Sequence, residues 1–350
     1  MKAYLILENG KVFCGESFGA VTEETGEIVF STSMGSYIEA LTDPCYYGQI
    51  LVQTFPLIGN YGIIHSDMES SKIYAKGYIV REICDMPSNF RCEGTLDSFL
   101  KEQGIMGICG VDTREITKII REEGTMTARI TTKEPDSVKL SALDIKNAVS
   151  VVSTKEKYTI GEGDVKIALL DFGTTKSAVK TLADKGATVT VLPYNTKANE
   201  LSDFDAIYLS DGPGNPEDMT DAINVIKEVF GKKPIFATGL GHQLLAMANG
   251  AKVEKLTYGH RGANQPVKQI ETGRVYITSQ NHSYAVVTGT LPKDAEVTYE
   301  NLNDKSCEGI DYKGKNAVSI QFHPIAGDGP NETNFLYNKF FEMIGGSKNA

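Results

Sequence analysis

The most informative segment of the sequence is Pro234-Ile235-Phe236-Ala237-Thr238-Gly239-Leu240-Gly241-His242-Gln243-Leu244-Leu245-Ala246. Its apolar start is typical of a short buried strand, and the residues after Gly241 are typical of a helix. The residues between them must be small, because a chain that doubles back leaves little room for side chains. Ala237 and Gly241 meet this requirement. The sequence therefore predicts a strand, a tight turn and a helix.

The segments before this stretch continue the same alternation of strand and helix. Strands are predicted over residues 167–171, 188–192 and 206–210, and helices over residues 178–183 and 222–230. Such alternation favours a mostly parallel sheet with helices on both faces. Ligands of these sheets bind at the carboxyl ends of the strands, where the turn at Gly239 would lie.

The amino-terminal part of the chain has a different character. Residues 1–150 are predicted to form a separate β/α domain, and residues 165–350 the α/β domain. Residues 151–164 are polar, contain two glycines and show no helical periodicity, which predicts an interdomain linker. The elements expected in the first domain are strands over residues 26–32 and 50–55 and helices near residues 97–102 and 112–121.

Composition limits the classes of function. The 350 residues are 41% hydrophobic and 23% charged, as in a globular protein, and the net charge of −10 disfavours nucleic acid as a partner. No apolar run is long enough for a membrane helix. The six cysteines form no CxxC pair, which favours free thiols in a reducing cytoplasm over disulfides or a zinc site. We therefore expect a cytoplasmic protein without a metal of its own.

The turn at Gly239 is similar to a nucleophile elbow, in which a strand-to-helix turn lifts one reactive side chain above the sheet. The residue at its apex is a glycine, which has no side chain that could attack a substrate. Glycine does suit the strained dihedral angles of such a turn, because it lacks a Cβ atom. The elbow is thus predicted to be present without its nucleophile.

These residues resemble the class I (triad) glutamine amidotransferases, whose elbow carries a cysteine at the position of Gly239. Downstream, Gln321-Phe322-His323-Pro324-Ile325 resembles the family's His-Pro-Glu motif. His323 matches the general base of the family. Ile325 stands where the family has the glutamate that orients this histidine. The chain therefore keeps only the middle member of the triad.

Both departures affect the chemistry that the resemblance implies. Hydrolysis of glutamine needs a thiolate activated by an imidazole, and a third group that fixes the tautomer of that imidazole. Loss of the nucleophile alone costs orders of magnitude in rate. We therefore expect that the chain does not hydrolyse glutamine, and that Ile325 packs in place of the carboxylate.

Further blocks resemble the small subunit of carbamoyl-phosphate synthase, and they extend over nearly the whole chain. The first domain contributes the stretches at residues 30–44, 56–62 and 110–114, and other amidotransferases of the class lack this domain. The second domain contributes those at residues 171–173, 209–216, 259–267 and 278–282. This ordered set implies a two-domain α/β fold with a class I amidotransferase domain at the carboxyl end.

The resemblance also implies a glutamine site. The residues that match it are Gly212, Gly214, Leu240, Gln243 and Asn281, and the backbone N–H of Leu240 corresponds to an oxyanion-hole donor. Other positions of the site depart from the family: Cys45 replaces a serine, Ser283 a glycine and Tyr284 a phenylalanine, with Thr175 and Ser177 in place of a lysine and an asparagine. The resemblance therefore implies the fold without implying that glutamine still binds.

In this family the small subunit supplies ammonia to a large subunit, which makes carbamoyl phosphate for pyrimidine and arginine synthesis. ATP and its metal ions belong to the large subunit, so no cofactor is expected in this chain. The partners implied are L-glutamine and a large subunit. We expect a small subunit without glutaminase activity that supports an ammonia-dependent synthase.

Two alternatives remain open. Cys45 would serve as a relocated nucleophile if a base lay within about 3 Å of its sulfur. Alternatively, the chain is a non-enzymatic regulatory or binding protein that has left the complex. The remaining family-block histidines, His242, His260 and His282, are interpreted as structural rather than catalytic.

Overall fold

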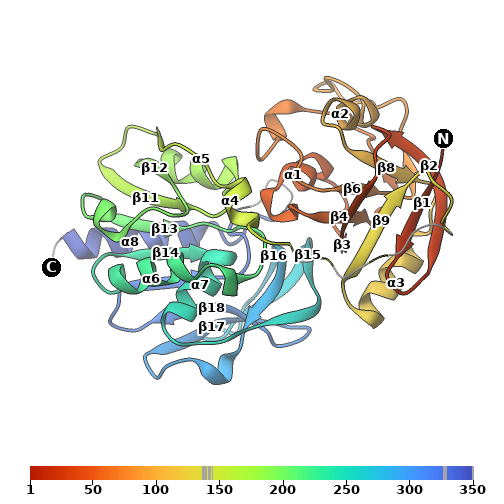
Figure 1. The fold of residues 1–350 in the computed structure, drawn as a ribbon. Coiled ribbons are helices and arrows are strands. Elements are labelled where there is room, and N and C mark those ends of the chain that lie inside the picture. Colours follow the sequence, from red (N-terminus) through yellow and green to blue (C-terminus); the bar gives the residue numbers. More distant parts are fainter. Residues whose placement is uncertain (136–139, 141–142, 144, 326–328, 349–350) are drawn as a thin grey trace. The chain divides into compact units, whose positions relative to one another are not determined.

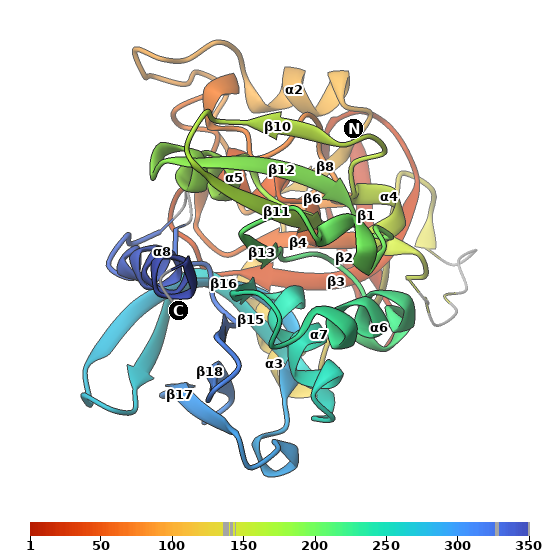
Figure 2. The ribbon, with the colours of Figure 1, turned by 90° about the vertical axis from the view of Figure 1, so that its left-hand side faces the viewer.

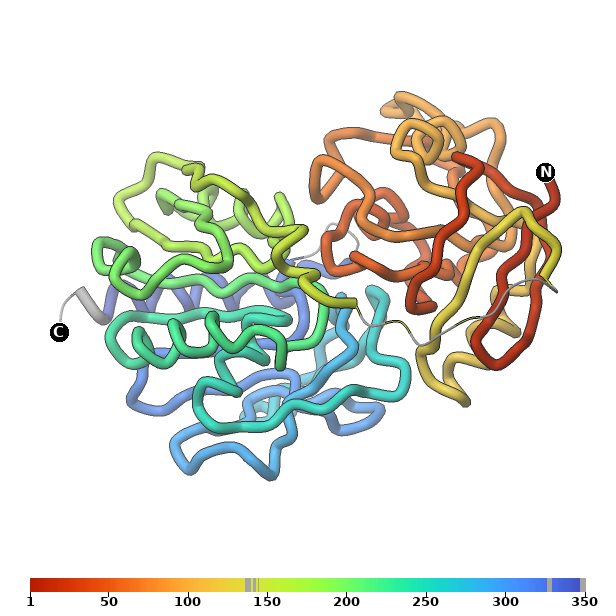
Figure 3. Tube along the Cα trace, in the orientation of Figure 1, coloured from red at the N-terminus to blue at the C-terminus, as the bar shows by residue number. Residues whose placement is uncertain are grey.

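The computed structural model describes residues 1–135, 140, 143, 145–325 and 329–348. The chain divides into two compact units, Met1–Ile145 and Lys146–Ala350. Figure 3 traces the chain through the first unit in red to yellow and through the second in green to blue. None of the helices in the described residues is long and apolar enough to cross a membrane.

The first unit is built on a closed barrel (Figure 1). Its strands, in order around the barrel, are β1 (Lys2–Leu7), β2 (Val12–Gly19), β8 (Met106–Cys109), β6 (Gly77–Ile79), β4 (Gln49–Gln53), β3 (Glu24–Ser31) and β9 (Met126–Thr131). The other elements are α1 (Tyr37–Thr42), α2 (Leu96–Glu102), α3 (Thr113–Glu123), the 3₁₀ turns Pro44–Tyr46 and His65–Asp67, and a small sheet of β5 (Leu57–Ile58) and β7 (Glu82–Ile83).

Helix α3 shows how local sequence sets these elements. The Asp112 side chain accepts hydrogen bonds from the backbone N–H groups of Arg114 and Glu115, at 3.1 and 3.0 Å, and so caps the helix. Its isoleucines at 116, 119 and 120 are buried on one face. The two strands and two helices expected in this unit are all present.

The second unit contains one ten-stranded sheet. Its strands, in spatial order, are β10 (Tyr158–Ile160), β12 (Ala187–Pro193), β11 (Val165–Asp171), β13 (Ala206–Leu209), β14 (Ile235–Thr238), β19 (Ala317–Ile320), β18 (Cys307–Tyr312), β17 (Ala295–Asn301), β15 (Val253–Gln269) and β16 (Val275–Val286). The five strands from β12 to β19 are parallel to one another, and the others pair antiparallel.

Helices cover both faces of the parallel part, as predicted (Figures 1 and 2). They are α5 (Lys176–Asp184) and α8 (Phe335–Lys348) on one face and α6 (Thr220–Val229) and α7 (Leu240–Ala248) on the other. Strand β11 explains the two layers, because successive side chains alternate between faces. Its Ala168 and Leu170 pack in the core with α6 and α7, while Ile167 and Leu169 pack with α5 and α8.

The stretch 151–164, expected as a linker, carries structure of its own. It contains the end of α4 (Ala148–Val152) and the strand β10, which pairs with β12. All three side chains of β10 are exposed, so this edge strand has no alternation of buried and exposed residues that would predict it. The remaining 3₁₀ turns are Ala198–Leu201, Pro216–Asp218 and Thr288–Thr290.

Candidate active site

The strand-to-helix turn between β14 and α7 has the geometry of an elbow. Gly239 at its apex adopts φ 51° and ψ −116°, which residues with a Cβ atom rarely adopt. The Gly239 N–H donates to the carbonyl of Ile320 at 3.1 Å, which ties the turn to β19. A Cβ atom on Gly241 would lie 2.4 Å from the carbonyl oxygen of Leu209, so the close passage over β13 requires glycine there.

The space above the apex is filled by the carboxylate of Asp211. A Cβ atom built on Gly239 would lie 1.9 Å from both Cγ and Oδ1 of Asp211, far inside van der Waals contact. Asp211 lies just after β13, at the carboxyl end of the strand next to β14. An acidic side chain therefore occupies the place from which an elbow nucleophile would project.

The same carboxylate uses the hydrogen-bond donors of the turn. Asp211 Oδ1 accepts from the backbone N–H groups of Leu240 and Gly212, both at 2.7 Å. The Leu240 N–H is the predicted oxyanion-hole donor. Because it lies at the amino-terminal end of α7, this donor site favours a negative charge. Asp211 supplies that negative charge from within the protein. Its carboxylate occupies the position in which the oxyanion of a substrate would otherwise bind.

His323 meets Asp211 on the other oxygen. Its Nε2 lies 2.7 Å from Asp211 Oδ2, and both side chains are largely buried, with 17% and 11% of their surface exposed. The backbone N–H of His323 donates to the carbonyl of Ser279 at 3.0 Å. The structure therefore joins His323 to a carboxylate, but to one at the nucleophile position.

Ile325 packs against the core cluster beneath α5 and α8, as expected for an apolar side chain in place of the acid. Asp211 is not among the predicted site residues, because residues 209–216 entered the prediction only as a block that resembles the family. The available signal was an acidic residue at the carboxyl end of the strand beside the elbow strand.

The remaining predicted glutamine-site residues of the second unit lie mainly on α7 and β16. The side-chain amide of Gln243 donates to the carbonyl of Tyr284 and to Oε1 of Gln321, both at 3.0 Å. The hydroxyl of Ser283 accepts from the guanidinium of Arg261. These polar groups are thus engaged within the protein itself. Leu240 and Asn281 are buried, whereas Gly212, Gly214, Ser283 and Tyr284 are partly exposed.

Three other positions that depart from the family, Thr175, Ser177 and Cys45, also have local partners. The hydroxyls of Thr175 and Ser177 lie 3.2 Å apart at the start of α5. Cys45 lies in the 3₁₀ turn Pro44–Tyr46 of the first unit, with its backbone N–H bonded to Asp43 Oδ1 at 2.9 Å. Its side chain is buried.

His242, one turn into α7, is completely buried, and its Nδ1 lies 2.8 Å from the hydroxyl of Ser319. Burial lowers the pKa of this imidazole to about 3, which keeps it neutral at physiological pH. This supports the interpretation of His242 as a packed residue of the helix.

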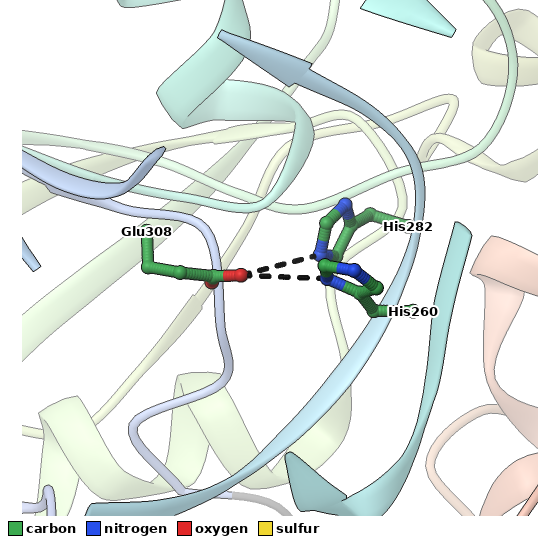
Figure 4. A group of neighbouring side chains, drawn as sticks. All are labelled: His260, His282 and Glu308. Carbon is green, nitrogen blue, oxygen red and sulfur yellow. Dashed lines mark ion pairs between the residues drawn. The ribbon is translucent and has the colours of Figure 1, made fainter. Parts of the chain in front are cut away.

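His260 and His282 lie together with Glu308 in a cluster that the sequence did not predict (Figure 4). Burial would lower the pKa of His260, but the neighbouring carboxylates of Asp304 and Glu308 raise it to about 9. Burial also raises the pKa of Glu308, and burial and the neighbouring His260 hold the pKa of His282 well below its usual value.

Comparisons with known proteins match nearly the whole length of the chain. Residues 5–130 match the family model "Carbamoyl-phosphate synthase small chain, CPSase domain", and residues 168–343 match "Glutamine amidotransferase class-I". Among curated relatives, the carbamoyl phosphate synthase small chain of Clostridium perfringens is 47% identical and covers 98% of this chain and 99% of its own. The small chain of Streptococcus pyogenes is 46% identical, and the match covers 98% of this chain and 97% of that one.

Among solved structures, a protein described as a GMP synthase subunit from Thermoplasma acidophilum matches 53% of this chain and 96% of its own. Its sequence identity is 20% and its TM-score is 0.47.

Proposed function

This chain belongs to the carbamoyl-phosphate synthase small chain family, and from that membership we propose that it is a small subunit whose amidotransferase site does not hydrolyse glutamine. The observation that carries the proposal is the Asp211 carboxylate over Gly239. It leaves the turn with neither a nucleophile nor an unoccupied oxyanion donor at Leu240.

The chemistry of amide cleavage supports this proposal. A nucleophile must attack the carboxamide carbon while N–H donors stabilise the oxygen that becomes negative. A carboxylate is a much weaker nucleophile than a thiolate, and the charge of Asp211 is already stabilised by two N–H groups and by His323. Because its negative charge also occupies the donors, a substrate oxyanion would be repelled from them.

The partner of such a chain is the large subunit of the synthase, since the curated relatives are named small chains of the same enzyme. In this proposal the large subunit carries the ATP chemistry and takes its nitrogen from free ammonia in the cytoplasm. Pyrimidine and arginine synthesis are the pathways that such a complex would feed.

The test is a comparison of nitrogen sources in the complex. The chain is purified together with its large subunit, and carbamoyl phosphate formation is measured with ammonium and with glutamine. We expect formation with ammonium, and with glutamine no more than the large subunit forms alone. Glutamine-dependent formation by the complex would overturn the proposal.

Two controls separate the alternatives. If glutamine supports the reaction and Cys45→Ala abolishes this support, the relocated nucleophile is the correct mechanism. If the chain does not copurify with the large subunit, the regulatory alternative replaces the proposal.

A further inference from the structure

The cluster of His260, His282 and Glu308 has the spacing of a metal site. The three side chains come from β15, β16 and β18 and converge on one point (Figure 4). Glu308 Oε1 lies 3.5 Å from His260 Nδ1 and 3.9 Å from His282 Nε2. Ligand atoms about 2.0–2.1 Å from a tetrahedral zinc ion lie roughly 3.4 Å from one another. The two separations from Glu308 are too long for good hydrogen bonds. All three candidate ligand atoms lie within 4.8 Å of one another, so a bound ion would have to draw them slightly closer together.

The other nitrogen of each histidine is held by an outer partner. His260 Nε2 lies 2.8 Å from a carboxylate oxygen of Asp304, and His282 Nδ1 lies 2.9 Å from the carbonyl oxygen of Tyr284. Each partner accepts an N–H, which turns the remaining nitrogen toward Glu308. Metal-binding histidines almost always have a carboxylate or carbonyl partner of this kind.

His282 also faces more acceptors than a neutral ring can satisfy. Its Nε2 lies 3.1 Å from Gln280 Oε1, while its Nδ1 faces Tyr284. The Gln280 amide is oriented by its own N–H donation to Thr278, whose hydroxyl donates to the Gln265 carbonyl. A neutral imidazole has one N–H, so an oxygen remains opposite a nitrogen lone pair. A cation between these atoms removes that conflict.

Glu308 is incompletely paired as well. The side chain is fully buried, and its Oε2 has no hydrogen-bond partner among the residues that the structure describes. Asn301 Nδ2 approaches both Glu308 Oε1 and His260 Nδ1, but each contact is 3.4 Å long. A buried carboxylate that lacks partners is costly, and a divalent ion would compensate its charge.

We propose that His260, His282 and Glu308 bind one divalent transition-metal ion of the zinc class, with Gln280 Oε1 as the neighbouring fourth ligand. Two imidazoles, one carboxylate and one further oxygen form a donor set that zinc accepts. The ion would tie β15, β16 and β18 together. Its binding is independent of the loss of glutaminase activity, because it involves none of the residues at the elbow.

The test is metal binding by the full chain after dialysis against a chelator. Titration with Zn²⁺ followed by calorimetry should give one ion per chain, and Co²⁺ should give the visible absorption of a four-coordinate site. Glu308→Gln should weaken zinc binding by at least about a hundredfold, and Asp304→Asn, an outer partner, by about 10–100-fold. Glu93→Gln is the matched control. It removes the carboxylate of the exposed His65–Glu93 pair in the first unit and should leave the affinity for zinc unchanged.

Far-UV circular dichroism shows whether each variant is folded. If Glu308→Gln does not fold, Asp304→Asn decides, because the Asp304 side chain is 42% exposed and tolerates the change better. The proposal is overturned if the folded parent binds no stoichiometric zinc, or if its affinity is unaffected by Asp304→Asn. In either case the cluster is a buried ion pair completed by Asn301.

Discussion

Two places in the second unit bring a histidine to a largely buried carboxylate, and they differ in how closely the groups approach. At the elbow, His323 and Asp211 are 2.7 Å apart, and both oxygens of Asp211 have donors at hydrogen-bond distance. In the cluster of Figure 4, the contacts of Glu308 to the two imidazoles are 3.5 and 3.9 Å, and one oxygen has no partner in the described part of the chain.

The two sites therefore differ in whether the carboxylate can still accept another group. Both carboxylate oxygens of Asp211 accept hydrogen bonds at short distance, so this side chain is held in place over Gly239. We call Asp211 a plug because it fills the position of the missing nucleophile. The contacts of Glu308 to the two imidazoles are longer and one of its oxygens has no partner among the described residues, which is why we propose Glu308 as a metal ligand. The carboxylate at the elbow is thus fully paired, whereas the carboxylate of the cluster interpreted as structural is not.

The largest expected effect is the return of glutaminase activity when the plug is removed. Gly239→Cys with Ile325→Glu rebuilds the triad in composition but leaves the new Cβ against Asp211, so we expect no activity. Adding Asp211→Ala should raise glutamine hydrolysis by at least about a hundredfold, a small part of the roughly 10⁶-fold that loss of a nucleophile costs a serine protease.

The measurement is glutamate release by the folded variants. Equal activity of the double and triple variants would show that Asp211 moves aside freely and is no plug. Inactivity of both would assign the obstacle to the departures at Cys45, Thr175, Ser177 and Ser283 instead.

A smaller effect is expected on stability. Gly239→Ala introduces a Cβ atom at positive φ and 1.9 Å from Asp211, so we expect a loss of about 2–4 kcal/mol in the free energy of unfolding. Gly250→Ala is the matched control, because Gly250 has φ 89° but no atom within 4 Å of a new Cβ among the described residues. It should cost only about 1 kcal/mol.

Denaturant unfolding measures both variants. In combination with Asp211→Ala, the cost of Gly239→Ala should fall by at least about 1 kcal/mol, since the clash disappears and the strain remains. Additive costs would mean that the two side chains do not compete for the same space.

The smallest effect concerns His242, a buried histidine hydrogen-bonded to a hydroxyl instead of a carboxylate. Its folded pKa of about 3 lies below the usual 6.5, so the unfolded chain binds a proton between these values that the folded chain does not. Stability contributed by this group is therefore lost as the pH falls below 6.5. Over pH 6.5 to 5 the loss amounts to roughly 2 kcal/mol.

His242→Asn keeps a polar atom near Ser319 and removes the titration, so its unfolding free energy should depend less on pH in this range. His65→Asn, an exposed histidine of the first unit, is the control for removal of an imidazole. An unchanged pH dependence in His242→Asn would contradict the neutral, buried state of His242.

Most of the parallel part of the second unit, and helix α3 of the first unit, could be predicted because their signals are local. Short apolar strands, the Asp112 cap and the small residues around Gly239 each dictate one element, and the structure confirms them. The antiparallel strands β15 to β18 gave no comparable signal. Strand β15 runs over 17 residues, its buried, partly buried and exposed positions follow no regular order, and it has two register shifts, so no alternation marks it.

The candidate site could be predicted only in part, for a related reason. The absence of a side chain at Gly239 can be read from one position, whereas the Asp211 plug depends on two strands that are adjacent in space and separated in sequence. The same holds for Glu308, which lies 26 residues after His282 in the sequence and meets it across the sheet.

The most direct test of the account is the rate of glutamine hydrolysis by the unmodified chain in complex with its large subunit, followed as glutamate released over a range of glutamine concentrations. With the Asp211 carboxylate in the place of the nucleophile, release should not exceed that of the isolated large subunit, whatever the concentration. Saturable release at about 1 s⁻¹ or faster, the ordinary range of enzymes, would contradict it.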